Sequence, residues 1–282
     1  MFRLAHLSDP HLPSPLGLGP LGELLSKRTL SRLSWRRKHR QHDPAVLAAL
    51  VADLKAQAPD HVAVTGDLTN FSTPGEFAAA RAWLETLGPT TEVTVSPGNH
   101  DALVARGHAR RFETFHPWFG DESGPDFPQV RRRGPVALVN LCSAIATPPL
   151  FASGRLGADQ LGRLGQVLDE LKGLTRIVLV HHPVGAGVVS RRKALSDAPA
   201  LREVLARHGA ELILHGHAHE PVFGAVAGIP VLGVPSASSP AGFKHAPARW
   251  HLIEIEAGHI QVTARGVTGE LGRYRLSAGI AA

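Results

Sequence analysis

Five short segments of this sequence carry carboxylate, amide and imidazole side chains at spacings that suit metal binding. They contain, in order, Asp9 with His11, Asp67, Gly98-Asn99-His100-Asp101, His181 with His182, and His217 with His219. A carboxylate or amide oxygen can bind a hard cation. An imidazole can bind a cation or transfer a proton near neutral pH. In the third segment, Asn99 is a candidate oxygen ligand, His100 a candidate proton donor, and Asp101 a candidate orienter of His100.

The combined donor set predicts two metal ions of a particular kind. Two carboxylates, one amide and at least four imidazoles, without a thiol, suit Mn, Fe, Co or Zn and do not suit a structural thiolate zinc site. Seven ligands are too many for one ion, but they suit two ions that share a bridging carboxylate. Two metal ions about 3.5–4 Å apart are a known arrangement for phosphoester hydrolysis.

The segment His215-Gly216-His217-Ala218-His219 adds weight to the metal interpretation. Three imidazoles within five residues repel one another when they are protonated, so such a cluster indicates a bound cation.

Strands must position these segments, because each follows an apolar, β-rich run. The predicted strands cover residues 2–7, 61–65, 92–95, 176–180 and 211–214. Such runs end in loops, which here hold the polar side chains. In open α/β sheets, ligands bind beyond the carboxyl ends of the strands. We therefore expect the five loops to converge on one rim, although they are far apart in sequence.

Helix signals separate most of the predicted strands. Helices are predicted over residues 43–57, 73–87, 158–171 and 197–208. Asp43, Thr73 and Asp197 are the expected N-caps. Further strands are predicted over residues 129–133, 136–141, 221–234, 249–256 and 259–267. This order predicts one α/β domain over residues 1–282 with a layered sheet core.

The ordered set Asp-x-His, Gly-Asp, Gly-Asn-His-Asp, His and Gly-His-x-His, over residues 4–219, resembles the calcineurin-like metallophosphoesterase superfamily. Within that superfamily, the arrangement resembles the bacterial binuclear-metal phosphodiesterases. The implied fold is an α/β four-layer αββα sandwich, in which two packed mixed β-sheets are flanked by helices. The resemblance also implies two groups of ligands. One ion would be held by Asp9, His11, Asp67 and His219, and the other by Asp67, Asn99, His181 and His217.

In this resemblance Asp67 bridges the two ions, and His181 is preferred to His182 because of the family's His-His-Pro pattern. His182 and His215 would then either lie behind the ligands or simply be residues at strand ends. The implied reaction is hydrolysis of a phosphoric ester by hydroxide that bridges two divalent or trivalent ions. His100 would protonate the leaving oxygen or stabilise its charge, and Asp101 would orient His100.

Composition restricts the compartment and the partners. The chain has 282 residues, a formal charge of +6, 17 histidines and one cysteine, so it forms no intramolecular disulfide. A reducing compartment fits this cysteine usage. Neither a signal peptide nor an apolar run of about 18 residues is evident, which predicts a cytoplasmic protein. The positive charge fits an anionic phosphoester substrate.

Residues 21–42 form an unusual basic stretch in which Arg28, Arg32, Arg36 and Arg40 recur every four residues. A helix there would be amphipathic and basic, which suits peripheral contact with an anionic membrane at its inner face. A solvated helix face is an equally good interpretation. Nucleic acid is a poor partner, because the basic residues lack interleaved aromatic side chains that stack on bases.

Three functions remain open at this point. A phosphodiesterase is the leading interpretation. A pyrophosphohydrolase of the UDP-2,3-diacylglucosamine type would use the basic stretch to reach an acylated substrate. A non-catalytic scaffold would retain the metal site for protein interaction, although such proteins typically lose His100 or a ligand.

Overall fold

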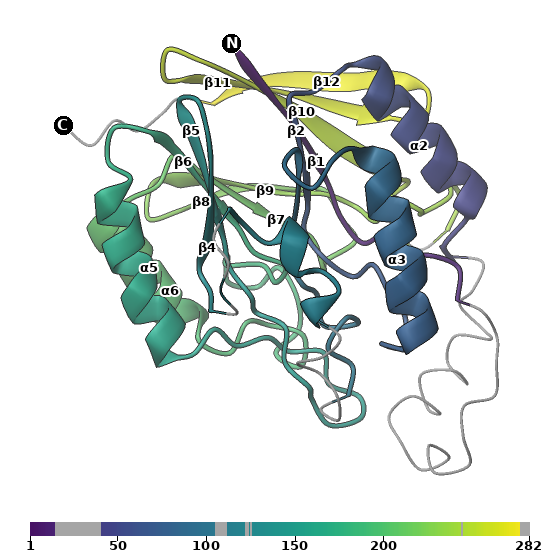
Figure 1. Ribbon diagram of the computed structural model, residues 1–282, viewed down its shortest axis with the longest axis horizontal. Helices are drawn as coiled ribbons and strands as arrows, with labels where there is room; N and C mark the ends of the chain where they lie inside the picture. Colours follow the sequence, from purple (N-terminus) through teal and green to yellow (C-terminus); the bar gives the residue numbers. More distant parts are fainter. Residues whose placement is uncertain (15–40, 105–111, 122–123, 125, 244, 277–282) are drawn as a thin grey trace.

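The computed structural model describes residues 1–14, 41–104, 112–121, 124, 126–243 and 245–276. Two mixed β-sheets of six strands each pack against one another, with helices on both outer sides (Figure 1). This arrangement confirms the predicted αββα sandwich.

The first sheet has the strand order β12-β11-β10-β1-β2-β3. Its strands are β1 (Phe2–Leu7), β2 (His61–Val64), β3 (Val93–Val95), β10 (Arg249–Glu256), β11 (His259–Gly266) and β12 (Gly269–Leu276). Strands β1, β2 and β3 are parallel neighbours, so their carboxyl ends meet at one edge. Strand β10 joins β1 in an antiparallel ladder and connects it to the β11–β12 hairpin.

The second sheet has the strand order β4-β5-β6-β7-β9-β8. Its strands are β4 (Gln129–Arg133), β5 (Val136–Asn140), β6 (Thr175–Leu179), β7 (Leu212–His215), β8 (Val222–Val226) and β9 (Ile229–Gly233). The four central strands, β5, β6, β7 and β9, are parallel. Strands β6 and β7 therefore deliver their following loops to the same edge of this sheet.

Among the described residues, two helices cover each sheet (Figure 1). Helices α2 (Pro44–Ala56) and α3 (Pro74–Leu87) pack on the first sheet, and α5 (Ala158–Glu170) and α6 (Ala198–His208) pack on the second. A separate 3₁₀ turn spans His116–Trp118.

The helix caps agree with the sequence in two cases and differ in one. Asp43 accepts a hydrogen bond from the backbone N–H of Ala45, and Thr73 forms a capping box with Glu76. Asp197 stands at the N-cap position of α6, but its carboxylate instead accepts hydrogen bonds from the backbone N–H groups that precede α5, at Leu156 and Gly157. Asp197 therefore joins two helices rather than capping one.

Three hydrophobic clusters fill the spaces between the four layers. The cluster between the sheets contains Leu4 and Ile253 from the first sheet, and Leu138, Ile177 and Leu214 from the second. All five are fully buried. Burial of one such Leu or Ile side chain stabilises the fold by about 2 kcal/mol. This shared layer fixes one sheet relative to the other, and it therefore fixes the loops from both sheets at one site.

Two parts of the chain need separate comment. Strand β12 was not predicted, because it is an edge strand in which only Leu276 is buried, so its sequence lacks an apolar alternation. Most of the predicted basic helix at 21–42 lies outside the described residues. None of the helices in the described ranges is both long and apolar enough to span a bilayer.

Candidate metal centre

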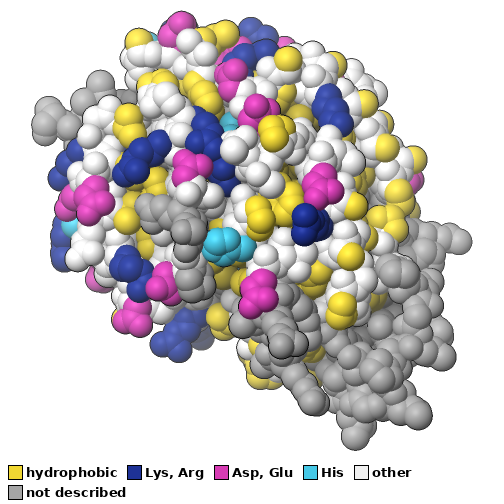
Figure 2. Space-filling model, in the orientation of Figure 1, with side chains coloured by type: hydrophobic (Ala, Val, Ile, Leu, Met, Phe, Trp, Pro, Cys, Tyr) yellow, Lys and Arg dark blue, Asp and Glu magenta, His cyan; other side chains and the backbone are white. Residues whose placement is uncertain are grey.

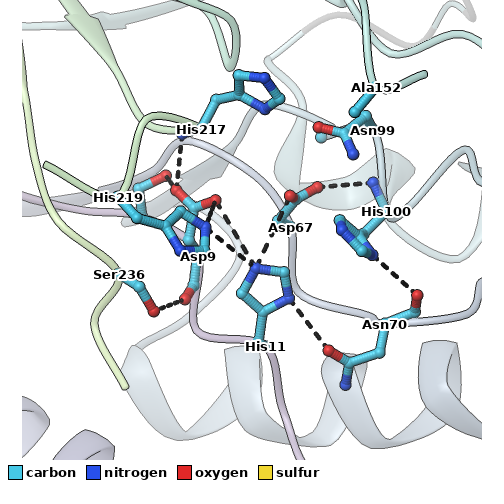
Figure 3. A network of polar contacts seen from close by, with 12 residues as sticks. Asp9, His11, Asp67, Asn70, Asn99, His100, Ala152, His217, His219 and Ser236 are labelled. Atoms are coloured by element: carbon cyan, nitrogen blue, oxygen red, sulfur yellow. Dashed lines mark hydrogen bonds and ion pairs between the residues drawn. The ribbon is translucent and has the colours of Figure 1, made fainter. Parts of the chain in front are cut away.

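The five predicted loops converge at the carboxyl ends of strands from both sheets. Asp9 follows β1, Asp67 follows β2, and Asn99 follows β3; His181 follows β6, and His217 follows β7. The two sheets are joined directly at this point. Ser8, at the end of β1, forms a parallel bridge with Ser236, and Nδ1 of His181 lies 2.6 Å from the Thr65 carbonyl. Figure 3 shows part of the resulting group of side chains, including Asp9, Asp67, Asn99 and His217.

The backbone of the candidate ligands adopts an uncommon conformation. Asp9, His11, Asp67, His217 and His219 all have positive φ, at 52°, 42°, 55°, 65° and 56°. Only a few per cent of non-glycine residues adopt this left-handed region, and it costs of order 1–3 kcal/mol where the surroundings impose it. Five such residues in one site indicate that the surrounding structure holds their backbone in this conformation, which directs their side chains into the site.

Two glycines allow the loops to approach the carboxylates closely. A Cβ atom on Gly98 would lie 2.2 Å from Oδ1 of Asp67, and one on Gly216 would lie 2.3 Å from Oδ2 of Asp9. Both distances are far inside van der Waals contact. The glycines in Gly-Asn-His and Gly-His-x-His therefore serve the packing of the site.

A first cluster of donor atoms forms around His11. Nε2 of His11 lies 3.4 Å from Nε2 of His219, and 3.9 Å from both Oδ1 of Asp9 and Oδ2 of Asp67. Nδ1 of His11 is 3.1 Å from Oδ1 of Asn70, whose amide nitrogen donates to the Leu12 carbonyl. This network places the His11 proton on Nδ1, so the Nε2 lone pair faces the other donors.

A second cluster forms around His181. Its Nε2 lies 3.4 Å from Oδ2 of Asp67, 3.2 Å from Oδ1 of Asn99 and 3.2 Å from Nδ1 of His217. Because Nδ1 of His181 donates to the Thr65 carbonyl, Nε2 of the neutral ring would bring a lone pair against two oxygen atoms, of Asp67 and Asn99. Nδ1 of His217 adds a third lone pair when its ring carries the proton on Nε2. Such a convergence requires a proton or a cation at its centre.

These clusters fit metal ions. Asp9, His11 and Asp67 each offer a ligand atom within 4.8 Å of the others, as do Asp67, His181 and His217. Asp67 belongs to both groups. The oxygen and imidazole donors match the chemistry of borderline divalent cations.

The electrostatics of the clusters lead to the same conclusion. Burial alone would raise the pKa of Asp9, but His219 and His181 lower it to about 2. Burial, together with His42 and His100, holds the pKa of His11 well below 6.5. For His181, burial would lower the pKa, but Asp67, Asp9 and the hydrogen bond to the Thr65 carbonyl together raise it to about 9. A proton on His181 therefore occupies the place that a cation would take, and cation binding would release it.

His100 stands beside both clusters and belongs to neither (Figure 3). Its ring lies edge-on to His11, with 5.0 Å between ring centroids. Its backbone N–H donates to Oδ1 of Asp67 at 2.7 Å, and its Nδ1 lies 2.9 Å from the Asn70 carbonyl. The ring is thereby oriented with Nδ1 away from the donors.

Asp101 does not make the contact with His100 that the sequence predicted. Its buried carboxylate accepts hydrogen bonds from the backbone N–H groups of Asp67, Thr69 and Gly98, at 2.9–3.0 Å. Among the contacts of the described residues, none joins this carboxylate to the His100 ring, which is oriented by Asn70. Asp101 therefore fastens the loop after β2 to the loop after β3.

His182 and His215 lie behind the clusters. His182 contacts the Ser143 hydroxyl through Nδ1 and the Ala152 carbonyl through Nε2, at 2.7 and 3.2 Å. Nδ1 of His215 lies 2.9 Å from the Gly216 carbonyl. Of the adjacent histidines 181 and 182, only His181 faces Asp67.

Sequence reasoning missed two residues of this site, Asn70 and His42. Asn70 lies three residues beyond Asp67, where it looks like an ordinary turn residue. His42 directly precedes the α2 cap, and only the folded chain brings it to His11, with 4.2 Å between ring centroids. Neither residue has a local sequence signal for these contacts.

Solved structures of phosphatases share this fold. A dimetal phosphatase from Danio rerio superimposes with a TM-score of 0.58 at 15% identity, over 98% of this chain and 99% of that one. A purple acid phosphatase from yellow lupin seeds gives a TM-score of 0.62 at 11% identity, over 98% of this chain and 53% of that one. At these identities the similarity shows the fold alone.

Sequence relatives and a family profile give the more specific result. A Synechococcus protein described as a probable cyclic nucleotide phosphodiesterase is 30% identical over 74% of this chain and 77% of its own length. A Rhodococcus erythropolis protein with the same description is 27% identical over 81% of this chain and 68% of its own length. The profile of the calcineurin-like phosphoesterases matches residues 2–221. The chain therefore belongs to the calcineurin-like phosphoesterase family and is a metal-dependent phosphoester hydrolase.

Proposed function

We propose that this protein is a binuclear-metal phosphodiesterase that acts on cyclic nucleotides or related diesters. The position of Asp67 carries the proposal. Its Oδ2 lies 3.9 Å from Nε2 of His11 and 3.4 Å from Nε2 of His181, so one carboxylate oxygen serves both donor clusters. The descriptions of the Synechococcus and Rhodococcus relatives support the diester substrate.

Seven residues would hold the two ions. Asp9, His11, Asp67 and His219 would bind the first, and Asp67, Asn99, His181 and His217 the second. Bound there, two cations would supply a hydroxide nucleophile at neutral pH and neutralise charge on the phosphoryl oxygens. The mixed oxygen and imidazole donors suit Mn, Fe, Zn or Co.

His100 is the residue of this chain that would protonate the leaving alkoxide. The Asn70 carbonyl accepts a hydrogen bond from the N–H at Nδ1, so Nε2 of the doubly protonated ring would be the nitrogen that gives its proton to the leaving oxygen. The bond from the His100 backbone to Asp67 fixes this ring relative to the shared carboxylate. General acid catalysis of this kind contributes about 10²–10⁴ in rate. Because no side chain need attack phosphorus, the reaction requires no covalent intermediate.

A substrate panel tests this proposal. EDTA-treated protein reloaded with Mn²⁺ is assayed with 3′,5′-cyclic AMP, a glycerophosphodiester, bis(p-nitrophenyl) phosphate, p-nitrophenyl phosphate and UDP-2,3-diacylglucosamine. We expect the diesters to be hydrolysed with a higher kcat/KM than the monoester. Preference for the monoester, or no turnover of any compound by metal-loaded protein, contradicts the proposal.

The same panel separates the two alternatives. Preference for the nucleotide-linked lipid would favour a pyrophosphohydrolase. Binding of metal without any turnover would favour a scaffold.

Vesicle sedimentation tests the membrane contact predicted for residues 21–42. The contact is supported if the protein co-sediments with anionic vesicles and loses this binding when Arg28, Arg32 and Arg36 are neutralised. If the wild-type protein does not bind the vesicles, the predicted membrane contact is wrong.

The surface and the topology bear on the remaining predictions. On the face shown in Figure 2, basic and acidic side chains of the described residues are interspersed, which offers little support for a nucleic-acid groove.

We also propose that residues 1–282 form one domain. Strands β10, β11 and β12, which lie beyond the match to the family profile, complete the same sheet as β1.

A further inference from the structure

A third imidazole stands at the edge of the first donor cluster. The ring centroid of His42 lies 4.2 Å from that of His11 and 5.7 Å from that of His219. His11, His42 and His219 each offer a ligand atom within 4.8 Å of the other two. His42 comes from the segment directly before α2, which is separate from the five loops that supply the other donors.

Two serine hydroxyl groups lie against Nδ1 of His42. Ser236 donates its hydroxyl proton to the Asp9 carbonyl at 2.6 Å. Nδ1 of His42 lies 2.9 Å from the Ser238 hydroxyl and 3.4 Å from the Ser236 hydroxyl. The Ser238 hydroxyl lies 3.2 Å from that of Ser236, and when it donates there it accepts from Nδ1 of His42. In that arrangement the His42 proton is on Nδ1, and Nε2 is the ring nitrogen that carries the lone pair.

The backbone fixes His42 to the same loop that supports Asp9. The N–H of Asp43, the next residue, donates to the Ser238 carbonyl at 2.8 Å, and the N–H of Ala237 donates to the Ser8 carbonyl at 2.9 Å. The position of the His42 ring is therefore built into the site. A ring held by its Nδ1 proton against an oxygen, with Nε2 toward a cation, is the usual arrangement of a metal-binding histidine.

We propose that His42 is a further ligand of the first metal ion, through Nε2, in addition to Asp9, His11, Asp67 and His219. The inference rests on the proposed binuclear function. A third imidazole makes this site richer in nitrogen than the second, which shifts its preference toward Zn, Co or Fe and away from Mg or Ca. A fifth protein ligand also leaves fewer open positions on that ion, so the phosphoryl oxygens would be directed toward the side of Asn99.

Cobalt binding tests the proposal without reference to turnover. Full-length protein is stripped of metal and titrated with Co²⁺, and the number of bound ions, their affinities and the visible absorption bands are recorded. His42→Asn is the main variant, because its amide nitrogen can replace Nδ1 against Ser238 while nothing replaces Nε2. Ser238→Ala removes only the hydroxyl that positions the ring. His245→Asn is the matched control, because His245 lies 5.5 Å from the His219 ring and belongs to none of the three-residue donor groups found in the described chain.

We expect His42→Asn to bind one of the two ions at least about tenfold more weakly and to change the cobalt bands. Ser238→Ala should change both readouts in the same direction but less, and His245→Asn should match the wild type. Circular dichroism verifies that the variants fold. If His42→Asn does not, His42→Ala supplies the same comparison, because it leaves no donor atom near the Nε2 position.

Two results would overturn the inference in distinguishable ways. If His42→Asn, or the folded His42→Ala that replaces it, binds both ions with wild-type affinity and spectrum, His42 is no ligand and the proposed function stands. If the wild-type protein binds no Co²⁺, Zn²⁺ or Mn²⁺, the proposed function fails and this inference fails with it.

Discussion

The backbone carbonyl of Asn70 lies 2.9 Å from Nδ1 of His100. The side-chain carbonyl of the same residue lies 3.1 Å from Nδ1 of His11. Both histidines therefore carry a proton on Nδ1, and Nε2 faces the donor cluster in His11 and the proposed substrate in His100. As a proton donor, the His100 ring would carry a second proton, on Nε2. One residue in the loop after β2 thus orients the rings of a proposed metal ligand and of a proposed proton donor.

Replacement of His100 should separate proton transfer from metal binding. We expect His100→Ala to retain both ions, because its ring belongs to neither donor cluster, and to lose about 10²–10⁴ in kcat on substrates with an alkoxide leaving group. The loss should be much smaller on bis(p-nitrophenyl) phosphate, whose leaving group is stable without protonation. Metal analysis and the ratio of the two kcat values measure this. An equal loss on both substrates would remove His100 from the role of general acid.

Replacement of Asn70 should weaken metal binding from outside the ligand set. Asn70→Ala removes the acceptor for Nδ1 of His11 and the donor to the Leu12 carbonyl. We expect metal affinity at the first site to fall about 10–100-fold, as for other partners of metal-binding histidines. Metal competition titration provides the measurement.

The matched control for Asn70 is Asn140, which is also buried and hydrogen-bonded, but to Ser96 and to two backbone carbonyls. Asn140→Ala should lower the free energy of unfolding by about 1–3 kcal/mol without changing metal affinity. If both variants lowered metal affinity equally, general loosening of the fold would explain the effect.

The sequence predicted which loops come together better than it predicted the sheet edges. The loops at Asp9, Asp67, Asn99, His181 and His217 were located because each combines a buried strand with ligand side chains, and both signals are local. Strand β12 carries little apolar alternation because it is an exposed edge, so its pairing with β11 is evident only in the fold.

The contacts that sequence reasoning missed depend on tertiary structure. His42 reaches His11 only because the Ser236–Ser238 loop holds it there. Asp101 follows His100 directly, which suggested an orienting contact, but its carboxylate is directed to backbone N–H groups of the neighbouring loop. The positive φ values of the ligands likewise depend on the packed site, although Asp and His adopt this conformation more often than most residue types do.

Stability should fall in mild acid because several histidines are buried without charge. Burial, followed by the charge of Arg131, lowers the pKa of His61 from 6.5 to about 3. Between these two pH values His61 binds more protons in the unfolded chain than in the folded protein. Its contribution to the free energy of unfolding is therefore complete above about pH 6.5 and is lost as the pH falls. For this residue, the free energy of unfolding changes by at most about 1.4 kcal/mol per pH unit.

His61→Gln isolates that contribution, since its amide can keep the contact to the Thr94 hydroxyl that Nε2 makes at 2.8 Å. Urea unfolding of metal-free protein at pH 5 and pH 7 should show a smaller pH dependence for the variant than for the wild type. The exposed His259 gives the control His259→Gln, which should behave as the wild type. Identical pH dependence in all three proteins would show that His61 does not titrate on unfolding.

The central claim is that Asp67 is shared by two metal ions, and metal stoichiometry of Asp67→Ala tests it most directly. The wild-type protein should bind two ions per chain. Asp67→Ala should bind fewer than one and hydrolyse bis(p-nitrophenyl) phosphate near the background rate, because the substitution removes a ligand from both ions. The exposed carboxylate of Asp169 supplies the control Asp169→Asn, which should keep two ions and full activity. An Asp67→Ala protein with two ions and wild-type turnover would contradict the account.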